Sequence, residues 1–330
     1  MLVEARSIRK EHDEFRTPLL IPSFSSKGFP EVKKIIAHNS ETISGGVLIS
    51  AYDIHHGIIS TTHMAFPEFI ILDSGGYEAS VDHDMSDLQK KVHVPIDGWN
   101  VKMHQKVLDD WAFKTPTIVV SYDNPKLRKP LDEQVARAHR LFKQYPRAIK
   151  CFLIKPEPGS KGRAKPKYID FKKILVNVEL LEGFDVIGLT EKELGASTFD
   201  RMKNIAHLRK ALTAANNDTP IHIFGSLDPI SSPLYFLSGA DIFDGLTWLR
   251  FAYSKGVAIY KHNYGALEVN IEMNDDVVNA QVWYRNYNAL IEMQCQMRQF
   301  LHTKNFSAFK ENEGFLRNAS ERLLEAVGGE

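Results

Sequence analysis

Cysteine is nearly absent from the 330-residue chain, which has only Cys151 and Cys295. Two thiols so far apart in the sequence exclude a disulfide framework and a zinc site built from cysteines, and they are typical of a protein in a reducing compartment. We therefore expect a cytoplasmic protein without a structural zinc ion.

Long apolar runs and an excess of charge are also absent. No run approaches the roughly 18 residues that a membrane span needs, and Met1–Arg16 has no apolar signal region. The 41 Lys and Arg residues balance the 41 Asp and Glu residues, so the chain has no overall field that attracts a polyanion. These features predict a soluble protein with no membrane partner, in which any nucleic-acid site is local.

Eight short apolar runs, each ending in polar residues or glycine, are the main pattern of the sequence. Several, such as Phe69–Ser74 (FIILDS), are continuous rather than alternating, as expected for parallel strands that are buried on both faces. Helical periodicity separates the later runs, at Leu131–Tyr145 and Phe199–Ala215. The alternation predicts a (β/α)8 barrel of the TIM type; an open doubly wound sheet is the alternative, but its GxGxxG fingerprint is missing. The predicted strands are Pro18–Pro22, Gly46–Ala51, Glu68–Ser74, Thr117–Asp123, Ile149–Lys155, Phe184–Leu189, Ile221–Ser226 and Asp241–Leu246.

The pattern changes after the last predicted strand. Asp275–Gln299 predicts a long helix and Ser307–Val327 a shorter one, with no strand after either. We therefore expect a barrel domain over residues 1–265 and a C-terminal helical extension over residues 266–330 that packs on the barrel. The irregular polar stretch His83–Asn100 is predicted to be a loop near the mouth of the barrel.

Three aspartates and several small residues lie where the predicted strands end. Parallel strands bring their carboxyl ends to one edge, where barrel enzymes place their chemistry, so we expect these side chains to meet in one pocket. Because a buried carboxylate is costly unless it is paired or hydrogen-bonded, three aspartates round one mouth favour a functional site. Asp also commonly caps the helix that follows a strand, and for Asp123 this structural interpretation is equally good. The candidates are Asp73, Ser74, Asp123, Gly188, Leu189, Phe224, Gly225 and Asp244.

Aromatic and basic residues near these strand ends are further candidates. Tyr77 and Phe224 could hold a flat ring between them, although two core aromatics would show the same pattern. Arg250, placed at the start of the next helical stretch, could bind a phosphate or carboxylate, or be an ordinary solvated arginine. A basic segment after the fifth strand is the best candidate for phosphate contacts, although most charged runs are solvated loops; its cations include Lys161, Arg163, Lys165 and Lys167.

Five of these patterns resemble, in order, the motifs of the tRNA-guanine transglycosylase family. Asp73–Tyr77 (DSGGY) resembles the family's DSGG(F/Y) signature, and Gly188–Glu193 (GLTEKE) resembles its GLxxxE turn. Phe224–Pro229 is similar to the glycine-proline turn after the seventh strand, Gly239–Arg250 to GxDxFDxxxxxR, and Thr17–Pro22 to the first strand. Each motif alone is weak, whereas the ordered set is specific.

The resemblance implies a (β/α)8 barrel that exchanges guanine in a nucleic acid for a 7-deazaguanine base without an external cofactor. By position, Asp244 is the nucleophile that bonds to the ribose C1′, and Asp73 is the general acid and base for the exchanged bases. The resemblance assigns base binding to Ser74, Tyr77, Asp123, Gly188, Leu189, Phe224 and Gly225, and contact with the nucleic-acid backbone to Arg250.

Three departures from the family pattern bear on the substrate. The family's zinc site of three cysteines and a histidine, which helps to dock tRNA, has no counterpart; Lys155–Pro158 (KPEP) replaces a glutamine-glycine-glycine, and Tyr253 replaces a second arginine. Relatives that modify guanine in DNA share the barrel, so we expect DNA slightly ahead of tRNA. The expected partners are therefore a nucleic acid and a free 7-deazaguanine base, together with either a second copy of the chain in a homodimer or a dedicated partner protein.

Two other functions fit the same residues. A non-catalytic partner subunit would bind the nucleic acid or an active homologue, but it would have no need of both Asp73 and Asp244. A hydrolase would cleave the glycosidic bond with the same two aspartates and pass the sugar to water. Incorporation of a free base distinguishes exchange from hydrolysis.

Overall fold

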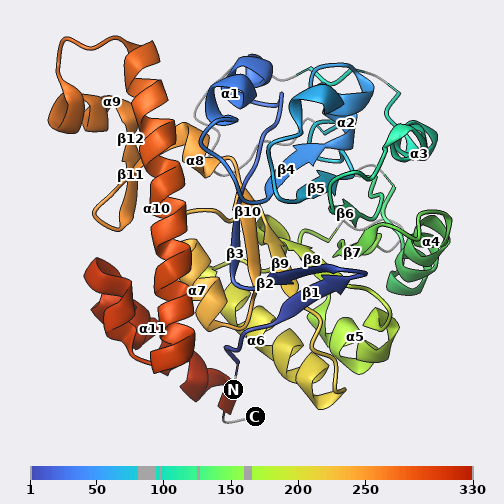
Figure 1. Cartoon of the computed structure of the whole chain (residues 1–330). Helices are drawn as coiled ribbons and strands as arrows, with labels where there is room; N and C mark the ends of the chain where they lie inside the picture. Colours follow the sequence, from blue (N-terminus) through green and yellow to red (C-terminus); the bar gives the residue numbers. More distant parts are fainter. Residues whose placement is uncertain (1, 81–93, 97, 125–126, 160–165, 329–330) are drawn as a thin grey trace.

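The predicted barrel is confirmed. The computed structural model describes residues 2–80, 94–96, 98–124, 127–159 and 166–328, and its central element is a sheet of eight parallel strands (Figure 1). The order in the sheet is β3-β10-β9-β8-β7-β6-β5-β4, and a parallel bridge between Ser23 and Leu48 joins the two outermost strands. The strands are β3 (Leu19–Pro22), β4 (Val47–Ser50), β5 (Ile70–Asp73), β6 (Thr117–Val120), β7 (Ile149–Ile154), β8 (Val186–Thr190), β9 (Ile221–Phe224) and β10 (Ile242–Gly245).

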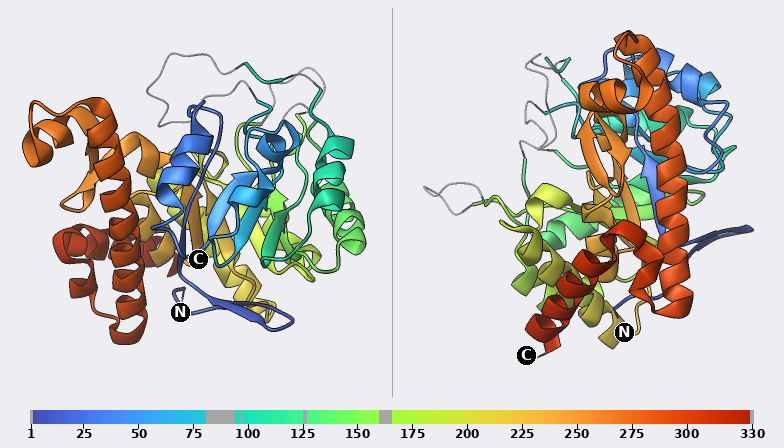
Figure 2. Two further views of the ribbon diagram at one scale, coloured as in Figure 1. Left: turned by 45° about the horizontal axis from the view of Figure 1, so that its top comes forward. Right: turned by 90° about the vertical axis from the view of Figure 1, so that its left-hand side faces the viewer.

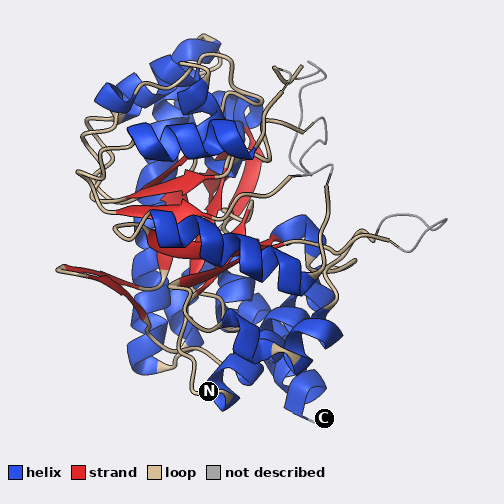
Figure 3. Ribbon diagram, turned by 90° about the vertical axis from the view of Figure 1, so that its right-hand side faces the viewer, coloured by secondary structure: helices blue, strands red, loops and turns tan. Residues whose placement is uncertain are grey.

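Helices cover the outer face of the sheet (Figure 3), and apolar side chains fill the barrel interior, so both faces of the sheet are buried. In β5, for example, Ile71 points into the barrel interior, whereas Ile70 and Leu72 pack against the outer helices. This alternation between two apolar environments explains why the strands are continuous apolar runs. The helical segments are α1 (Val32–Asn39), α2 (Ala51–His55), η1 (Thr61–His63), α3 (Val101–Asp110), α4 (Leu131–Gln144), α5 (Phe171–Val176), η2 (Val178–Leu181), η3 (Glu191–Glu193), α6 (Thr198–Ala214), α7 (Ser231–Leu237) and α8 (Thr247–Arg250).

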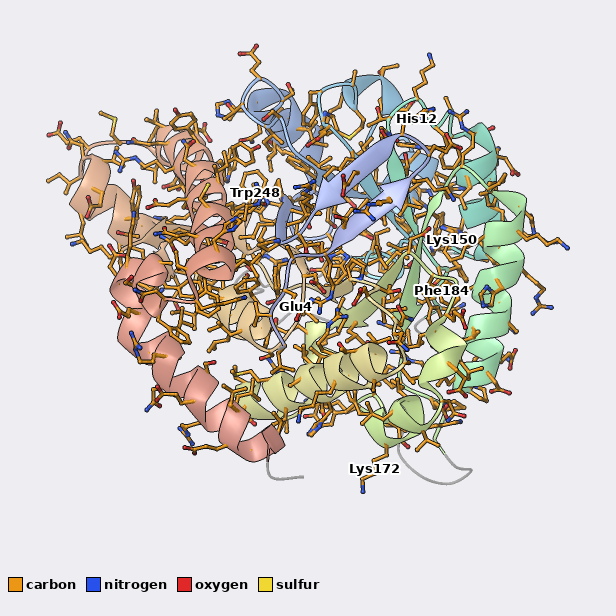
Figure 4. The ribbon with its side chains drawn as sticks, turned by 60° about the horizontal axis from the view of Figure 1, so that its bottom comes forward. Glu4, His12, Lys150, Lys172, Phe184 and Trp248 are labelled. Carbon is orange, nitrogen blue, oxygen red and sulfur yellow. The ribbon has the colours of Figure 1, made fainter. Side chains whose placement is uncertain are left out.

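A hairpin that the sequence patterns did not predict closes the amino-terminal end of the barrel. It consists of β1 (Ser7–Lys10) and β2 (Asp13–Arg16), which pair antiparallel. Ile8 and Phe15 join the apolar cluster of the barrel interior, and the Phe15 ring lies 4.5 Å from that of Phe69. Figure 4 views this end of the molecule and shows the hairpin lying across it, with His12 at its turn. The barrel therefore opens only toward the carboxyl ends of its strands.

The C-terminal helical extension is confirmed, with two differences in detail. The long helix α10 (Asp275–Thr303) ends four residues later than predicted, and the second predicted helix is divided into η5 (Phe306–Asn312) and α11 (Glu313–Gly328). Lys310, with φ of +47°, interrupts the helical backbone within η5. Before α10 the chain forms a second unpredicted hairpin, followed by two short helical segments. These elements are β11 (Phe251–Ser254), β12 (Val257–Tyr260), α9 (Lys261–Tyr264) and η4 (Gly265–Val269).

Helix α10 runs along the seam where β3 and β4 meet (Figures 1 and 2). The Leu19 N–H donates to the backbone carbonyl of Asp241, which directly precedes β10. Because successive N–H groups of a strand point in opposite directions, the Leu20 N–H points away from β10. Leu20 donates instead to the Gln294 Oε1 of α10 at 3.1 Å. Ahead of β4, Ser44 donates its N–H to the Tyr287 hydroxyl at 3.2 Å. The extension thus provides hydrogen-bond partners on both sides of the seam.

Two further expectations concern the loops and the membrane. Most of the predicted loop His83–Asn100 lies outside the described residues. Within the described part of the chain, the helices are too short or too polar to span a bilayer.

Candidate active site at the carboxyl ends of the strands

A cavity of about 150 Å³ lies at the open end of the barrel. Asp73, Asp123 and Asp244 all line it, although β5, β6 and β10 supply them from distant parts of the sequence. Tyr77, Phe224 and Gly225 line it as well. The structure therefore brings the three predicted aspartates and both predicted aromatic residues to one cavity.

Asp244 is a buried carboxylate with a hydrogen-bond partner on each oxygen. Its side chain is 7% exposed, its Oδ2 accepts from the Ser23 hydroxyl at 2.8 Å, and its Oδ1 lies 2.9 Å from the His222 Nε2. The imidazole of His222 is fully buried and stacks on the Phe224 ring, with centroids 3.8 Å apart. The functional prediction missed both partners. The detectable signal was a histidine inside the apolar run of β9, because a buried polar group needs a partner.

Asp73 is the last residue of β5, and its surroundings favour the protonated acid. Burial raises its pKa well above the usual range for Asp, and the charges of Glu78, Asp123 and Asp244 add to this effect. One N–H, from Gly75, donates to Oδ2 at 3.1 Å and opposes the rise in pKa only in part. Gly75 has φ of +83°, so the turn that aims this N–H at Asp73 favours glycine. Asp244, with a hydrogen-bond partner on each oxygen, and Asp73, whose surroundings favour the protonated acid, thus lie in one cavity in contrasting environments.

Glu78 is a buried carboxylate of the cavity wall that sequence reasoning missed, although it directly follows the DSGGY motif. Its oxygens accept from the hydroxyl groups of Ser25 and of Ser50, the latter at 2.7 Å. Behind it, burial and the charge of Glu78 raise the pKa of Asp53 to about 7. Glu78 therefore contributes negative potential that favours a proton on neighbouring carboxyl groups.

Asp123 and Lys155 form a second polar wall. The Ser74 hydroxyl donates to Asp123 Oδ1 at 2.5 Å, and the Lys155 Nζ lies 3.8 Å from Oδ2. Lys155 also contacts Glu193 at 2.8 Å and donates to the Thr190 hydroxyl at 3.0 Å, so its ammonium group is held firmly. In the strand order, β6 and β10 lie on opposite sides of the barrel, which places this wall across the mouth from Asp244.

The structure places several predicted base-binding residues behind the cavity rather than on its surface. Leu189 is fully buried, and the Phe224 ring covers Gly188, where a Cβ would lie 2.7 Å from that ring. Ser74 is likewise buried and acts on the cavity through Asp123. Their places in the cavity lining are taken by the residues that follow Leu189, namely Thr190, Glu191, Lys192 and Glu193.

Arg250 ends the one-turn helix α8 instead of starting a helix, and it is 9% exposed rather than solvated. Its Nη2 donates to the Tyr77 hydroxyl at 3.2 Å, because α8 turns the chain back over the mouth. Lys27, also missed, lies 4.2 Å above the Tyr77 ring and donates to the Tyr77 carbonyl at 2.9 Å. Tyr77 is therefore fixed by two cations.

The basic segment is only partly described. Lys161, Arg163 and Lys165 lie outside the described residues, and Lys167 is exposed, with its Nζ 5.4 Å from the Tyr168 ring. Among the described residues, no group of three or more His, Cys, Asp and Glu side chains is arranged to hold a metal ion.

Compared with models of known protein families and with curated proteins, the chain matches no family model and no curated sequence at a significant level. The resemblance to transglycosylases therefore rests on the sequence motifs.

Proposed function

We propose that the protein is a nucleic-acid transglycosylase, which exchanges a guanine for a 7-deazaguanine base through a covalent bond between Asp244 and the sugar. The observation that carries the proposal is the contrast between two carboxyl groups of one cavity. Asp244 has hydrogen-bonding partners at both oxygens, whereas the pKa of Asp73 is raised by burial and by negative neighbours. Such a pair divides the work of a nucleophile and a proton donor.

The proposed reaction has two balanced steps. In the first, an oxygen of Asp244 bonds to C1′ while the bond from C1′ to the guanine nitrogen breaks, and Asp73 gives its proton to the departing base. In the second, Asp73 accepts a proton from the incoming 7-deazaguanine, whose nitrogen bonds to C1′ and displaces Asp244. Both side chains return to their starting states, so the exchange needs no external cofactor.

The wall opposite Asp244 supports a guanine-like base. A base joined to its sugar near Asp244 directs its far edge toward Asp123 and Lys155. Asp123 can accept from the N1–H and the exocyclic amine of guanine, and Lys155 can donate to its carbonyl oxygen. Tyr77 and Phe224 supply aromatic surfaces in the same cavity. Adenine presents an acceptor and a donor in the reverse order, which fits this wall poorly.

DNA remains slightly favoured over tRNA, because the cysteines of the family's tRNA-docking zinc site are missing from the sequence. Arg250 and the basic segment from Lys161 to Lys167 are the proposed contacts with the backbone. The test is base exchange: purified protein is incubated with labelled guanine or 7-cyano-7-deazaguanine, and label is counted in duplex DNA and in bulk tRNA.

We expect label in DNA, and none with Asp244→Asn or Asp73→Asn. Label in tRNA alone would reverse the preference for DNA. Release of free base without incorporation would assign a hydrolase instead. Absence of label in both polymers, together with absence of an Asp244 adduct, would favour the partner subunit.

A further inference from the structure

The two nitrogens of the His222 ring have different surroundings. Nε2 lies 2.9 Å from Asp244 Oδ1, whereas Nδ1 is buried and has no hydrogen-bond partner among the described residues. The face of the imidazole stacks on the Phe224 ring at an interplanar angle of 29°. The imidazole is fully buried in β9.

This asymmetry selects one form of the imidazole. A proton on Nδ1 alone would leave a buried donor without an acceptor, and would set the Nε2 lone pair against the lone pairs of the carboxylate. Protons on both nitrogens would again leave the Nδ1–H unsatisfied, and the resulting cation would neutralise Asp244. The neutral form with its proton on Nε2 avoids each of these costs.

We propose that His222 is a positioning residue for Asp244, which holds Oδ1 through its Nε2–H and leaves Oδ2 to bond with the sugar. This inference rests on the proposed function, since it assigns the two oxygens of the proposed nucleophile. Carbonyl oxygens of esters accept hydrogen bonds well, so Oδ1 keeps its bond to His222 when the ester forms. Oδ2 is held by the Ser23 hydroxyl, which can rotate away when Oδ2 becomes the ester's bridging oxygen.

His222 also connects the nucleophile with the base site. Phe224 lies between the imidazole and the cavity, and the missing side chain of Gly188 provides the room for its ring. Replacing His222 therefore disturbs both the hydrogen bond to Asp244 and the surface offered to the base. An experiment must separate these two effects.

The matched pair His222→Gln and His222→Asn separates them. Both variants lose the aromatic stack and keep an amide, but the longer Gln side chain places its nitrogen near the position of Nε2, and Asn places it near Nδ1. We expect His222→Asn to slow formation of the Asp244–sugar adduct by about 100-fold, and His222→Gln to restore most of the rate. The KM for the free base should change equally in the two variants. Equal losses of rate in both variants would overturn the proposal, as would normal rates in both.

A second measurement does not depend on turnover. Nitrogen-15 NMR of the histidine-labelled full chain, with His222→Gln identifying the signal, reports which nitrogen carries the proton. We expect the neutral Nε2–H form at neutral pH; the Nδ1–H form or the doubly protonated ring would overturn the proposal. If this form is found in a protein that exchanges no base, the proposed function fails while the pairing of His222 with Asp244 stands.

Discussion

Two aspartates at opposite ends of β10 illustrate how differently the barrel treats its two edges. Asp241 lies just before the strand at the amino end, and its oxygens contact Arg6 at 3.2 Å and Arg209 at 2.7 Å. The N–H of Ile221 donates to it as well, at 2.8 Å. Burial lowers the pKa of Arg209, and the charge of Asp241 opposes this effect. The charges at this edge compensate each other and stabilise the fold.

Asp244, three residues later, is almost as buried but has different partners. In the described part of the chain, its hydrogen-bond partners are a histidine and a serine rather than guanidinium groups. With His222 in the proposed neutral form, these hydrogen bonds orient the carboxylate without neutralising it. The comparison teaches that the partners of a buried aspartate, more than its burial, distinguish the structural role of Asp241 from the catalytic role proposed for Asp244.

The largest expected effect is the loss of chemistry in Asp244→Asn. The amide cannot act as a nucleophile, so we expect base exchange to fall by at least about 10⁴-fold. Urea unfolding should show a stability within about 1 kcal/mol of wild type, because Ser23 and His222 keep a polar partner. Exchange within tenfold of wild type would remove Asp244 from the mechanism.

Asp241→Asn should produce the opposite pattern. The substitution removes the buried carboxylate that Arg6 and Arg209 share, while Glu4, 3.9 Å from Arg6, is exposed to solvent. Breaking a buried ion pair in this way costs about 3–5 kcal/mol of unfolding free energy. Urea unfolding measures this loss, with Asp244→Asn as the matched control on the same strand. The rate of exchange per folded molecule should not change; a stable but inactive variant would show that the two edges are not separate.

A smaller effect is expected across the mouth, at Lys155. Lys155→Met keeps the apolar stem and removes the ammonium group, while Glu193 keeps its contact with Arg128. Loss of the proposed donor to the base carbonyl should raise the KM for guanine by about 10- to 100-fold. Steady-state exchange measures this change, and Lys143→Met, at an exposed position near the end of α4, is the control. An unchanged KM would exclude Lys155 from base recognition.

The smallest expected effect is a shift in pH dependence caused by Glu78→Gln. The charge of Glu78 raises the pKa of Asp73, and the first step uses the protonated form of Asp73. Removing the charge lowers that pKa. The alkaline decline of the rate should therefore begin at a lower pH than in the wild type. A pH profile of single-turnover adduct formation tests this, and an unmoved alkaline limb would contradict it.

The barrel could be predicted because its strands are short, mostly apolar runs. The hairpin of β1 (SIRK) and β2 (DEFR) could not, because each strand presents a single buried apolar side chain, Ile8 and Phe15, to the barrel. With one apolar residue in four, neither strand shows the alternation of apolar and polar residues that would predict it. Only the three-dimensional structure shows that these two side chains meet under the barrel.

The aspartates of the site could be predicted for a similar reason, since strand ends converge in any parallel barrel. The side chains that contact the site residues could not be predicted from their positions in the sequence. His222 lies inside an apolar run, and Lys27 lies in a loop fifty residues before Tyr77, which its ammonium group contacts. Arg250 ends α8 rather than starting a helical stretch as predicted, because a helix of one turn is too short to show a period. Such contacts depend on tertiary geometry that local patterns do not encode.

The seam between β3 and β4 has a consequence for the order in which the protein is made. Tyr287 and Gln294, whose side chains bond to backbone groups on either side of the seam, follow all eight strands in the chain. Of the eight strands, β3 leaves the ribosome first, whereas β10 and then α10 follow only after all the other strands of the sheet. Until then the nascent barrel carries an unpaired strand edge, which is a site for aggregation. We therefore expect chains that stop between β10 and α10 to be captured by chaperones, whereas chains that reach Thr303 should escape them.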